Sequence, residues 1–311
     1  MPDNFNKLRT FTPMYRNFTN PSGKPKLGDK CYADVYTVIC VLNIVCSLTA
    51  FLGNFLVLGA VWKTRILHKP TNLLVSGLAV SDLGVGVLIQ PLFTLFLILE
   101  MRSEGSIRDM WKIFRSIQAV FQSATILILT SISVDRFLAL QLHLKYVSMV
   151  TINKTATLLC FIWVTSAFCA MTVFIGNNLY RNFIITLIML CLVINSSMHF
   201  MIYRICHRHR VQIQVQIRAQ NGLETLNIKR YRKSLITMIF LFILLMACYF
   251  PYICMRTSMN FIHWSSPLKK LVMRCTLFLV YLNSSLNPLV YCWRMREMRS
   301  AVKQFWKSLH P

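Results

Sequence analysis

The sequence predicts an all-α membrane protein: a seven-transmembrane helix bundle with a short amphipathic eighth helix. Of the 311 residues, 55% are hydrophobic and 14% are charged, whereas soluble domains carry roughly 25% charged residues. Apolar runs long enough to cross a hydrocarbon core of about 30 Å, which takes roughly 20 helical residues, recur along the chain. The pattern divides the chain into an extracellular amino-terminal segment (1–35), the bundle (36–293) and an interfacial helix with a short cytoplasmic tail (294–311).

The predicted spans are joined by polar connections. In chain order the spans are 36–62, 71–99, 111–141, 154–176, 183–206, 234–259 and 268–292. The next stretch, 294–309, differs because bases alternate with Met298, Phe305 and Trp306 at helical spacing. We therefore expect it to lie along the membrane interface.

Lysine and arginine set the expected orientation. They gather after the first, third and fifth spans and in the carboxy-terminal tail, and the positive-inside rule places such segments in the cytoplasm. The amino terminus is then extracellular, where Asn17-Phe18-Thr19 forms a glycosylation sequon. We expect a multi-pass protein of the plasma membrane.

The net charge of +24 raises the alternative of nucleic-acid binding. Because the bases fall between apolar runs, loops beside an anionic membrane surface explain them better. We predict membrane lipids, and no nucleic acid, as partners. The chain shows no nucleophile–base pair, phosphate loop or zinc-finger cysteine spacing, so we predict neither enzymatic activity nor an organic cofactor.

Polar side chains inside the apolar spans form the first candidate site, because a polar group facing lipid is costly unless it is partnered. Asp82 is the only carboxylate in the apolar heart of the second span. Its expected partners are Asn54, Thr125, Asn283, Ser284 and Asn287. The alternative is a set of hydrogen bonds that only pack helices; we favour that alternative for Ser133, and a functional cluster for Asp82 with Asn283 and Asn287.

Two spans contain an interior proline, Pro251 in the sixth and Pro288 in the seventh. An interior proline removes a backbone hydrogen bond and kinks a helix, so both spans have a weakened point for a tilting motion. Prolines that membrane helices merely tolerate are the alternative.

Five motifs occur in order on spans one, two, three, six and seven. They are Gly53-Asn54, Leu78-Ala79-Val80-Ser81-Asp82, Asp135-Arg136-Phe137, Cys248-Tyr249-Phe250-Pro251 and Asn287-Pro288-Leu289-Val290-Tyr291. Together they resemble the rhodopsin-like (class A) G-protein-coupled receptors, over about 36–309. The resemblance implies a receptor that binds an extracellular ligand and activates heterotrimeric G proteins through movement of helices six and seven.

The resemblance also implies roles for single residues. For G-protein coupling and activation these are Asp135, Arg136, Phe137, Tyr203, Tyr249, Pro251, Asn287, Pro288 and Tyr291. The carboxylate of Asp135 is expected to hold the guanidinium of Arg136 until the G protein competes for it. The cluster around Asp82 matches the pocket that holds sodium in many inactive receptors, so Na⁺ is the one metal ion we expect, as an allosteric ion.

The chain departs from the family at three places. Trp111 stands where the third span usually has a disulfide cysteine, the connection before the fifth span has no cysteine, and Asn195 replaces the usual proline of that span. Tyr249 replaces a tryptophan. These departures are similar to those of the melanocortin receptors and their adenosine, cannabinoid and lysophospholipid relatives, without assigning the chain to one member.

The resemblance places the ligand pocket at Arg115, Gln118, Arg256 and Tyr281. Bases on the outward side favour an anionic lipid or peptide as ligand, through charge-assisted hydrogen bonds; loop bases that are merely solvated are the alternative. A disulfide between Cys31 and Cys275 would tie the amino terminus to the seventh span, and free thiols are the alternative.

Other functions compete with a coupled receptor. A ligand-binding decoy that does not couple is compatible with Phe137 and Tyr249, although intact Arg136 argues against it. A transporter or ion pathway would need a chain of ionisable residues across the membrane, and Asp82 is the only one found.

Overall fold

The computed structural model describes residues 27–64, 69–101, 108–142, 144–217, 225–259, 261, 266–294 and 296–309. α1 spans Leu27–Lys63, α2 Pro70–Gly84, the π-helical turn η3 Val85–Ile89, and α3 Gln90–Met101. α4 spans Arg108–Leu142, α5 Leu144–Met149, α6 Ile152–Ile175 and α7 Asn177–Ile217. α8 spans Thr225–Ser258, α9 Ser266–Arg294 and α10 Arg296–Leu309.

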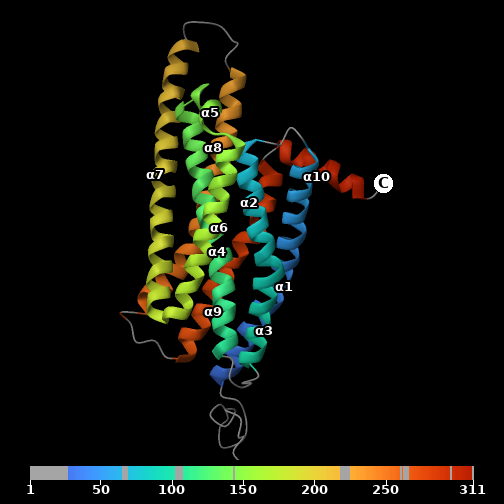
Figure 1. Cartoon of the computed structure of the whole chain (residues 1–311), viewed down its shortest axis with the longest axis vertical. Coiled ribbons are helices and arrows are strands. Elements are labelled where there is room, and N and C mark those ends of the chain that lie inside the picture. Colours follow the sequence, from blue (N-terminus) through green and yellow to red (C-terminus); the bar gives the residue numbers. More distant parts are fainter. Residues whose placement is uncertain are drawn as a thin grey trace, which may run out of the picture.

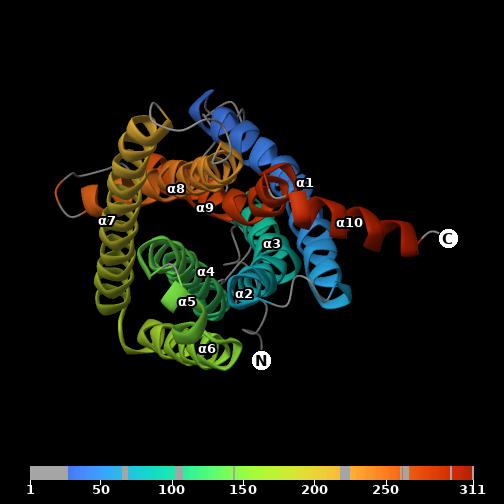
Figure 2. The ribbon, with the colours of Figure 1, turned by 90° about the horizontal axis from the view of Figure 1, so that it is seen from above.

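The predicted seven-helix bundle is confirmed. In the described residues, six helical segments are long and apolar enough to cross a membrane, and the shorter apolar helix Phe242–Ser258 within α8 completes the seven. α2, η3 and α3 together make one of the crossings. The helices lie side by side with their axes roughly along the long direction of the molecule (Figure 1), and they enclose a common centre when seen from above (Figure 2).

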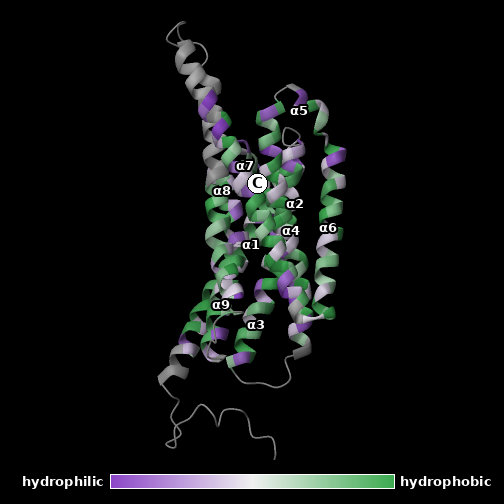
Figure 3. Cartoon of the chain, turned by 90° about the vertical axis from the view of Figure 1, so that its left-hand side faces the viewer, coloured by the Kyte–Doolittle hydropathy of each residue, from purple (hydrophilic) through white to green (hydrophobic). Residues whose placement is uncertain are grey.

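We name the two ends of the bundle outer and inner, after the membrane orientation that the sequence predicts. The outer end holds the start of α1 and the junctions from α3 to α4, α6 to α7 and α8 to α9, whereas the inner end holds Arg136, α5 and α10. The inner end is uppermost in Figure 1. Polar residues gather toward the ends and apolar residues cover the middle of the helices (Figure 3), as a membrane protein requires.

Two helices extend beyond the predicted spans at the inner end. α7 continues to Ile217 instead of ending near 206, and α8 begins at Thr225 instead of near 234. Hydropathy predicts only the part of a helix that lies in lipid. A helix satisfies its backbone hydrogen bonds internally, so it continues through these basic segments whatever their hydropathy.

The second span is not one regular helix. The π-helical turn Val85–Ile89 interrupts it shortly before Pro91. Proline has no backbone N–H and its ring meets the carbonyl of the preceding turn, and a π turn absorbs that misfit. The Asn43 side chain of α1 stabilises the region, because its Nδ2 donates to the Gln90 carbonyl (2.7 Å) and to Thr94 Oγ1 (2.8 Å).

Close contact between α1 and α9 explains one residue of the first motif. A methyl group added at Gly53 would lie 2.8 Å from Pro288 Cβ, closer than side chains pack. Glycine therefore allows the two backbones to approach at this level. Beside it, Asn54 is fully buried, and its Nδ2 donates to the carbonyls of Ala50 (2.8 Å) and Ser284 (3.2 Å).

α10 is the amphipathic helix that the sequence predicts. It crosses the inner end of α1 and points away from the bundle (Figure 2). Its apolar face packs inward through buried Met298 and Ala301, and Phe305 lies against Phe55 of α1 with ring centroids 6.3 Å apart. Lys303 and Lys307 are exposed on the opposite face.

Candidate ligand and signalling sites

The polar residues predicted around Asp82 lie together in the middle of the bundle. Asp82 is fully buried, and its Oδ2 accepts a hydrogen bond of 2.8 Å from Asn287 Nδ2 of α9. Ser284, one turn earlier on α9, approaches the same carboxylate. Thr125 of α4 is also buried, but its hydroxyl pairs with Ser81 (2.9 Å) rather than with Asp82.

The donor atoms of this cluster fit a small hard cation. Among the described residues of this cluster, the buried oxygens Asp82 Oδ1 and Asn54 Oδ1 have no hydrogen-bond partner. Carboxylate, amide and hydroxyl oxygens are the ligands that such cations prefer. Asn283, by contrast, leaves its Nδ2 donor without a partner in the described part of the chain, so this amide nitrogen is not suited to a cation.

At the inner end, Asp135 is the centre of a second polar group. Its side chain is 5% exposed. Oδ1 accepts from the Tyr146 hydroxyl of α5 (2.6 Å), and Oδ2 accepts from Thr71 Oγ1 of α2 (2.8 Å). Burial, and next the hydrogen bond to Asp135, raise the pKa of Tyr146, so this hydroxyl stays protonated and donates at neutral pH. Sequence patterns did not indicate Thr71 or Tyr146.

The neighbouring Arg136 is held less tightly than Asp135. Its Nε lies 3.9 Å from Asp135 Oδ2, within ion-pair range but beyond a hydrogen bond. Its side chain is 25% exposed, and its buried Nε has no hydrogen-bond partner among the described residues. Phe137 beside it is half-buried.

The remaining residues assigned to activation are spread along α7, α8 and α9. Tyr249 and Tyr291 are fully buried, and Pro251 and Pro288 lie inside unbroken helices. Tyr203 is 59% exposed on α7, with its ring 6.1 Å from that of His207. Tyr203 is therefore at the surface of α7, whereas Tyr291 is inside the bundle.

Toward the outer end, two arginines, one on α4 and one on α8, each contact a tyrosine ring. The guanidinium of Arg115 lies over the Tyr180 ring of α7 at 4.6 Å, and that of Arg256 lies over Tyr252 at 5.5 Å. Arg256 Nε also donates to the Tyr252 hydroxyl (3.1 Å). The two guanidinium groups are close enough to interact electrostatically.

A small cavity, with room for about one water molecule, lies deeper in the bundle. Gln118, Gln122, Thr125, Tyr249, Tyr281 and Ser284 contribute its polar lining. Gln118 Nε2 donates to Gln122 Oε1 (3.2 Å), and in the described residues the Tyr281 hydroxyl has no hydrogen-bond partner. The cavity connects the level of Gln118 with the level of the Asp82 cluster, through Thr125 and Ser284.

Comparison with known proteins decides the family. Residues 53–291 match the family described as 7 transmembrane receptor (rhodopsin family). The chain belongs to this family. It is thus a G-protein-coupled receptor and not an enzyme, and the family assignment made from the five motifs is confirmed.

The receptor is similar to members of several branches of the family. It is 27% identical to melanocortin receptor 5 of Bos taurus, with 83% of this chain and 81% of the relative covered. It is 25% identical to adenosine receptor A2a of Cavia porcellus (88% and 73% covered) and 24% identical to a QRFP-like peptide receptor of Branchiostoma floridae (82% and 73% covered). Relatives this different do not define the ligand of this receptor.

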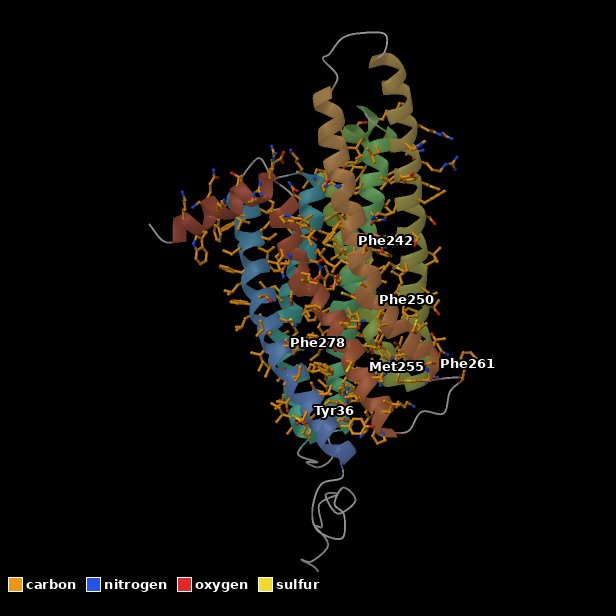
Figure 4. The ribbon with its side chains drawn as sticks, turned by 180° about the vertical axis from the view of Figure 1, so that it is seen from behind. Tyr36, Phe242, Phe250, Met255, Phe261 and Phe278 are labelled. Carbon is orange, nitrogen blue, oxygen red and sulfur yellow. The ribbon has the colours of Figure 1, made fainter. Side chains whose placement is uncertain are left out.

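Asn195, which replaces the usual proline, joins α7 to α4. Its Oδ1 accepts from Ser133 (2.6 Å), and its Nδ2 donates to Thr130 Oγ1 (2.8 Å). One turn later, His199 stacks on Phe242 of α8, with ring centroids 4.7 Å apart; Phe242 is labelled in Figure 4. The packing role predicted for Ser133 agrees with this contact. Thr130 and the role of Asn195 were not predicted, because spacing along one helix does not indicate which residues of another helix lie beside it.

Two predicted modifications fall partly or wholly outside the described residues. Asn17 of the sequon lies outside them. Cys275 is half-buried with a free thiol, and the side chain of Cys31 is not described. Glycosylation and the Cys31–Cys275 bond therefore remain predictions.

Proposed function

We propose that the receptor binds an anionic ligand at its outer end and activates a heterotrimeric G protein at its inner end. The proposal places the receptor in the plasma membrane with its amino terminus outside. The observation that carries it is the pair Arg115 and Arg256, each of which lies on a tyrosine ring toward the outer end of the bundle.

Two guanidinium groups near each other repel, and a medium of low dielectric constant strengthens the repulsion. An anion bound between the two guanidinium groups would be attracted to both, and this attraction would outweigh their mutual repulsion. Each guanidinium offers several N–H donors in a planar fork, which matches a carboxylate or phosphate. Tyr180 and Tyr252 hold the two groups in place by cation–π contact. The favoured ligand is an acidic lipid or acidic peptide whose charged head binds here.

Gln118 and Tyr281 lie below the arginines and would bind the uncharged part of such a ligand. Both are buried and line the cavity. The Tyr281 hydroxyl is available to donate or accept, which adds one directional contact to the charge of the arginines.

At the inner end, the partly exposed Arg136 is the group that docks the G protein. Its weak contact with Asp135 leaves the guanidinium available once helices α8 and α9 move. Asn54, Asp82, Thr125, Ser284 and Asn287 would hold Na⁺ between the two ends. A bound cation stabilises the charged form of Asp82 and so favours the arrangement described here.

The test is a screen in cells that express the full chain with a panel of G-protein reporters. Oleoyl lysophosphatidate, oleate, acidic peptides and adenosine serve as probes. An active anionic probe should lose potency by roughly 30-fold in Arg115→Ala and in Arg256→Ala, since a charged hydrogen bond is worth about 2 kcal/mol. The matched control is Lys269→Ala, an exposed base at the same end, which should behave as the parent.

A dose response that survives both arginine substitutions contradicts the anionic-ligand proposal. A probe that binds without activating any reporter identifies a non-coupling receptor, and then the signalling half of the proposal is wrong. Tyr203 favours this second candidate, because its side chain is exposed on α7 whereas Tyr291 is buried.

A further inference from the structure

The outer end of α4 lacks the covalent tie that the family usually has there. Trp111 occupies the position of the cysteine. The partner loop is also missing, because α6 ends at Ile175, α7 begins at Asn177, and only Gly176 joins them. A different set of contacts must therefore hold the first turns of α4.

Three side chains from three helices meet at this place, and we call them the outer clamp: Glu100 of α3, Trp111 of α4 and Arg274 of α9. Arg274 Nε donates to Glu100 Oε2 at 3.1 Å. The same guanidinium lies 4.1 Å from the centre of the Trp111 ring. Arg274 thus joins α9 to α3 by an ion pair and to α4 by a cation–π contact.

Burial distinguishes the clamp from an ordinary surface ion pair. The side chains of Arg274 and Glu100 are 13% and 20% exposed. Lys270, one turn earlier on α9, approaches the same carboxylate at 3.5 Å but is 63% exposed. Water and salt screen the exposed pair much more than the buried one. The hydroxyl of Tyr36, near the outer end of α1 in Figure 4, also lies close to Arg274.

A cluster of aromatic side chains extends from the outer clamp toward the centre of the bundle. Trp111 packs against Phe96 and Phe114, with both centroids 5.2 Å away. Phe93 then contacts Phe114 (6.5 Å) and the edge of Tyr281 (5.1 Å). Tyr281 lies two turns after Arg274 on the same face of α9. One face of α9 is therefore joined to α3 and α4 at two levels.

We propose that the outer clamp replaces the missing disulfide and fixes the outer turns of α4 against α3 and α9. Trp111 lies one turn before Arg115 on α4, so the clamp also fixes the turn that carries Arg115. Only this last consequence rests on the proposed function; the clamp itself does not.

A double-mutant cycle on the purified full chain tests the proposal. Glu100→Gln and Arg274→Gln should each lower the midpoint of thermal unfolding by roughly 5–10 °C, and the double variant by no more than the worse single one. The matched control is Lys270→Gln, which removes the exposed pair to the same carboxylate and should shift the midpoint by less than about 2 °C. Shifts that add in the double variant, or a control as damaging as Arg274→Gln, overturn the proposal.

Hydrogen exchange separates a local clamp from general stabilisation. In Arg274→Gln, and in Trp111→Leu, amides in the first turns of α4 (108–118) should exchange at least tenfold faster, while those of α6 keep the parent rate. Uniformly faster exchange in every helix contradicts the proposal. The Cys275→Ser variant cannot form the predicted Cys31–Cys275 bond. Its thermal midpoint should be the same with and without reducing agent. A lower midpoint under reduction would show that another disulfide holds this end, and it would overturn the proposal that the outer clamp replaces the missing one.

Discussion

Replacing Asp135 by asparagine tests how the inner end restrains Arg136. The substitution keeps the shape of the side chain and removes its charge. An asparagine also places an N–H donor where one of the two carboxylate oxygens stands, so one of the hydroxyls of Tyr146 and Thr71, which donate at 2.6 and 2.8 Å, loses its acceptor at that position. If these contacts favour the resting receptor, signalling without ligand must rise in Asp135→Asn.

The magnitude follows from the ion pair. At the observed 3.9 Å between Arg136 Nε and Asp135 Oδ2, two unit charges attract by about 4 kcal/mol at an effective dielectric constant of about 20. Desolvation of the buried carboxylate offsets a large part of this. A net loss of about 1–2 kcal/mol remains, which corresponds to a roughly 5–30-fold change in the ratio of resting to active receptor.

The assay is reporter activity without ligand, divided by the amount of receptor at the cell surface. Glu297→Gln is the matched control. Lys69 and Glu297 are also 3.9 Å apart, but their side chains are 57% and 50% exposed, so loss of this ion pair should leave basal activity unchanged. Tyr146→Phe keeps the charge and removes one hydrogen bond, so we expect a smaller rise. Unchanged basal activity in Asp135→Asn, at equal surface expression, would falsify this reasoning.

Three further predictions concern the middle of the bundle. Raising NaCl while holding ionic strength constant with a choline salt should lower basal signalling of the parent but not of Asp82→Asn; a sodium response in both variants excludes the Asp82 site. Gly53→Ala should lower thermal stability by about 1–3 kcal/mol because the added methyl meets the rigid Pro288 ring, whereas Gly176→Ala, where the added methyl meets nothing within 4 Å, should be neutral; equal effects contradict the packing argument. Asn195→Leu should cost about 1–2 kcal/mol through its lost bonds to α4, and a thermal midpoint at the parental value would show that those bonds do not contribute.

The sequence predicted the site residues best where a motif and burial coincide. Asp82 and Asn287 are conspicuous as polar groups in apolar spans, and they form a direct hydrogen bond. The pairing of Thr125 with Ser81 was not predicted, because hydroxyls have many acceptable partners and only the rotation of each helix selects one. The same holds for Asn43, whose partners Gln90 and Thr94 lie on another helix beside the π turn.

The sequence by itself determined that the chain crosses the membrane in seven helices, which family it belongs to, and which polar residues lie in its centre. Lipid imposes these features locally, since every span must be long, apolar and internally hydrogen-bonded. Only the tertiary structure decided how the helices face one another. It showed that two hydroxyls hold Asp135, that Tyr203 is exposed at the surface of α7, and that Arg274 lies between Glu100 and Trp111. These contacts depend on the rotation and spacing of separate helices, which periodicity along one helix does not encode.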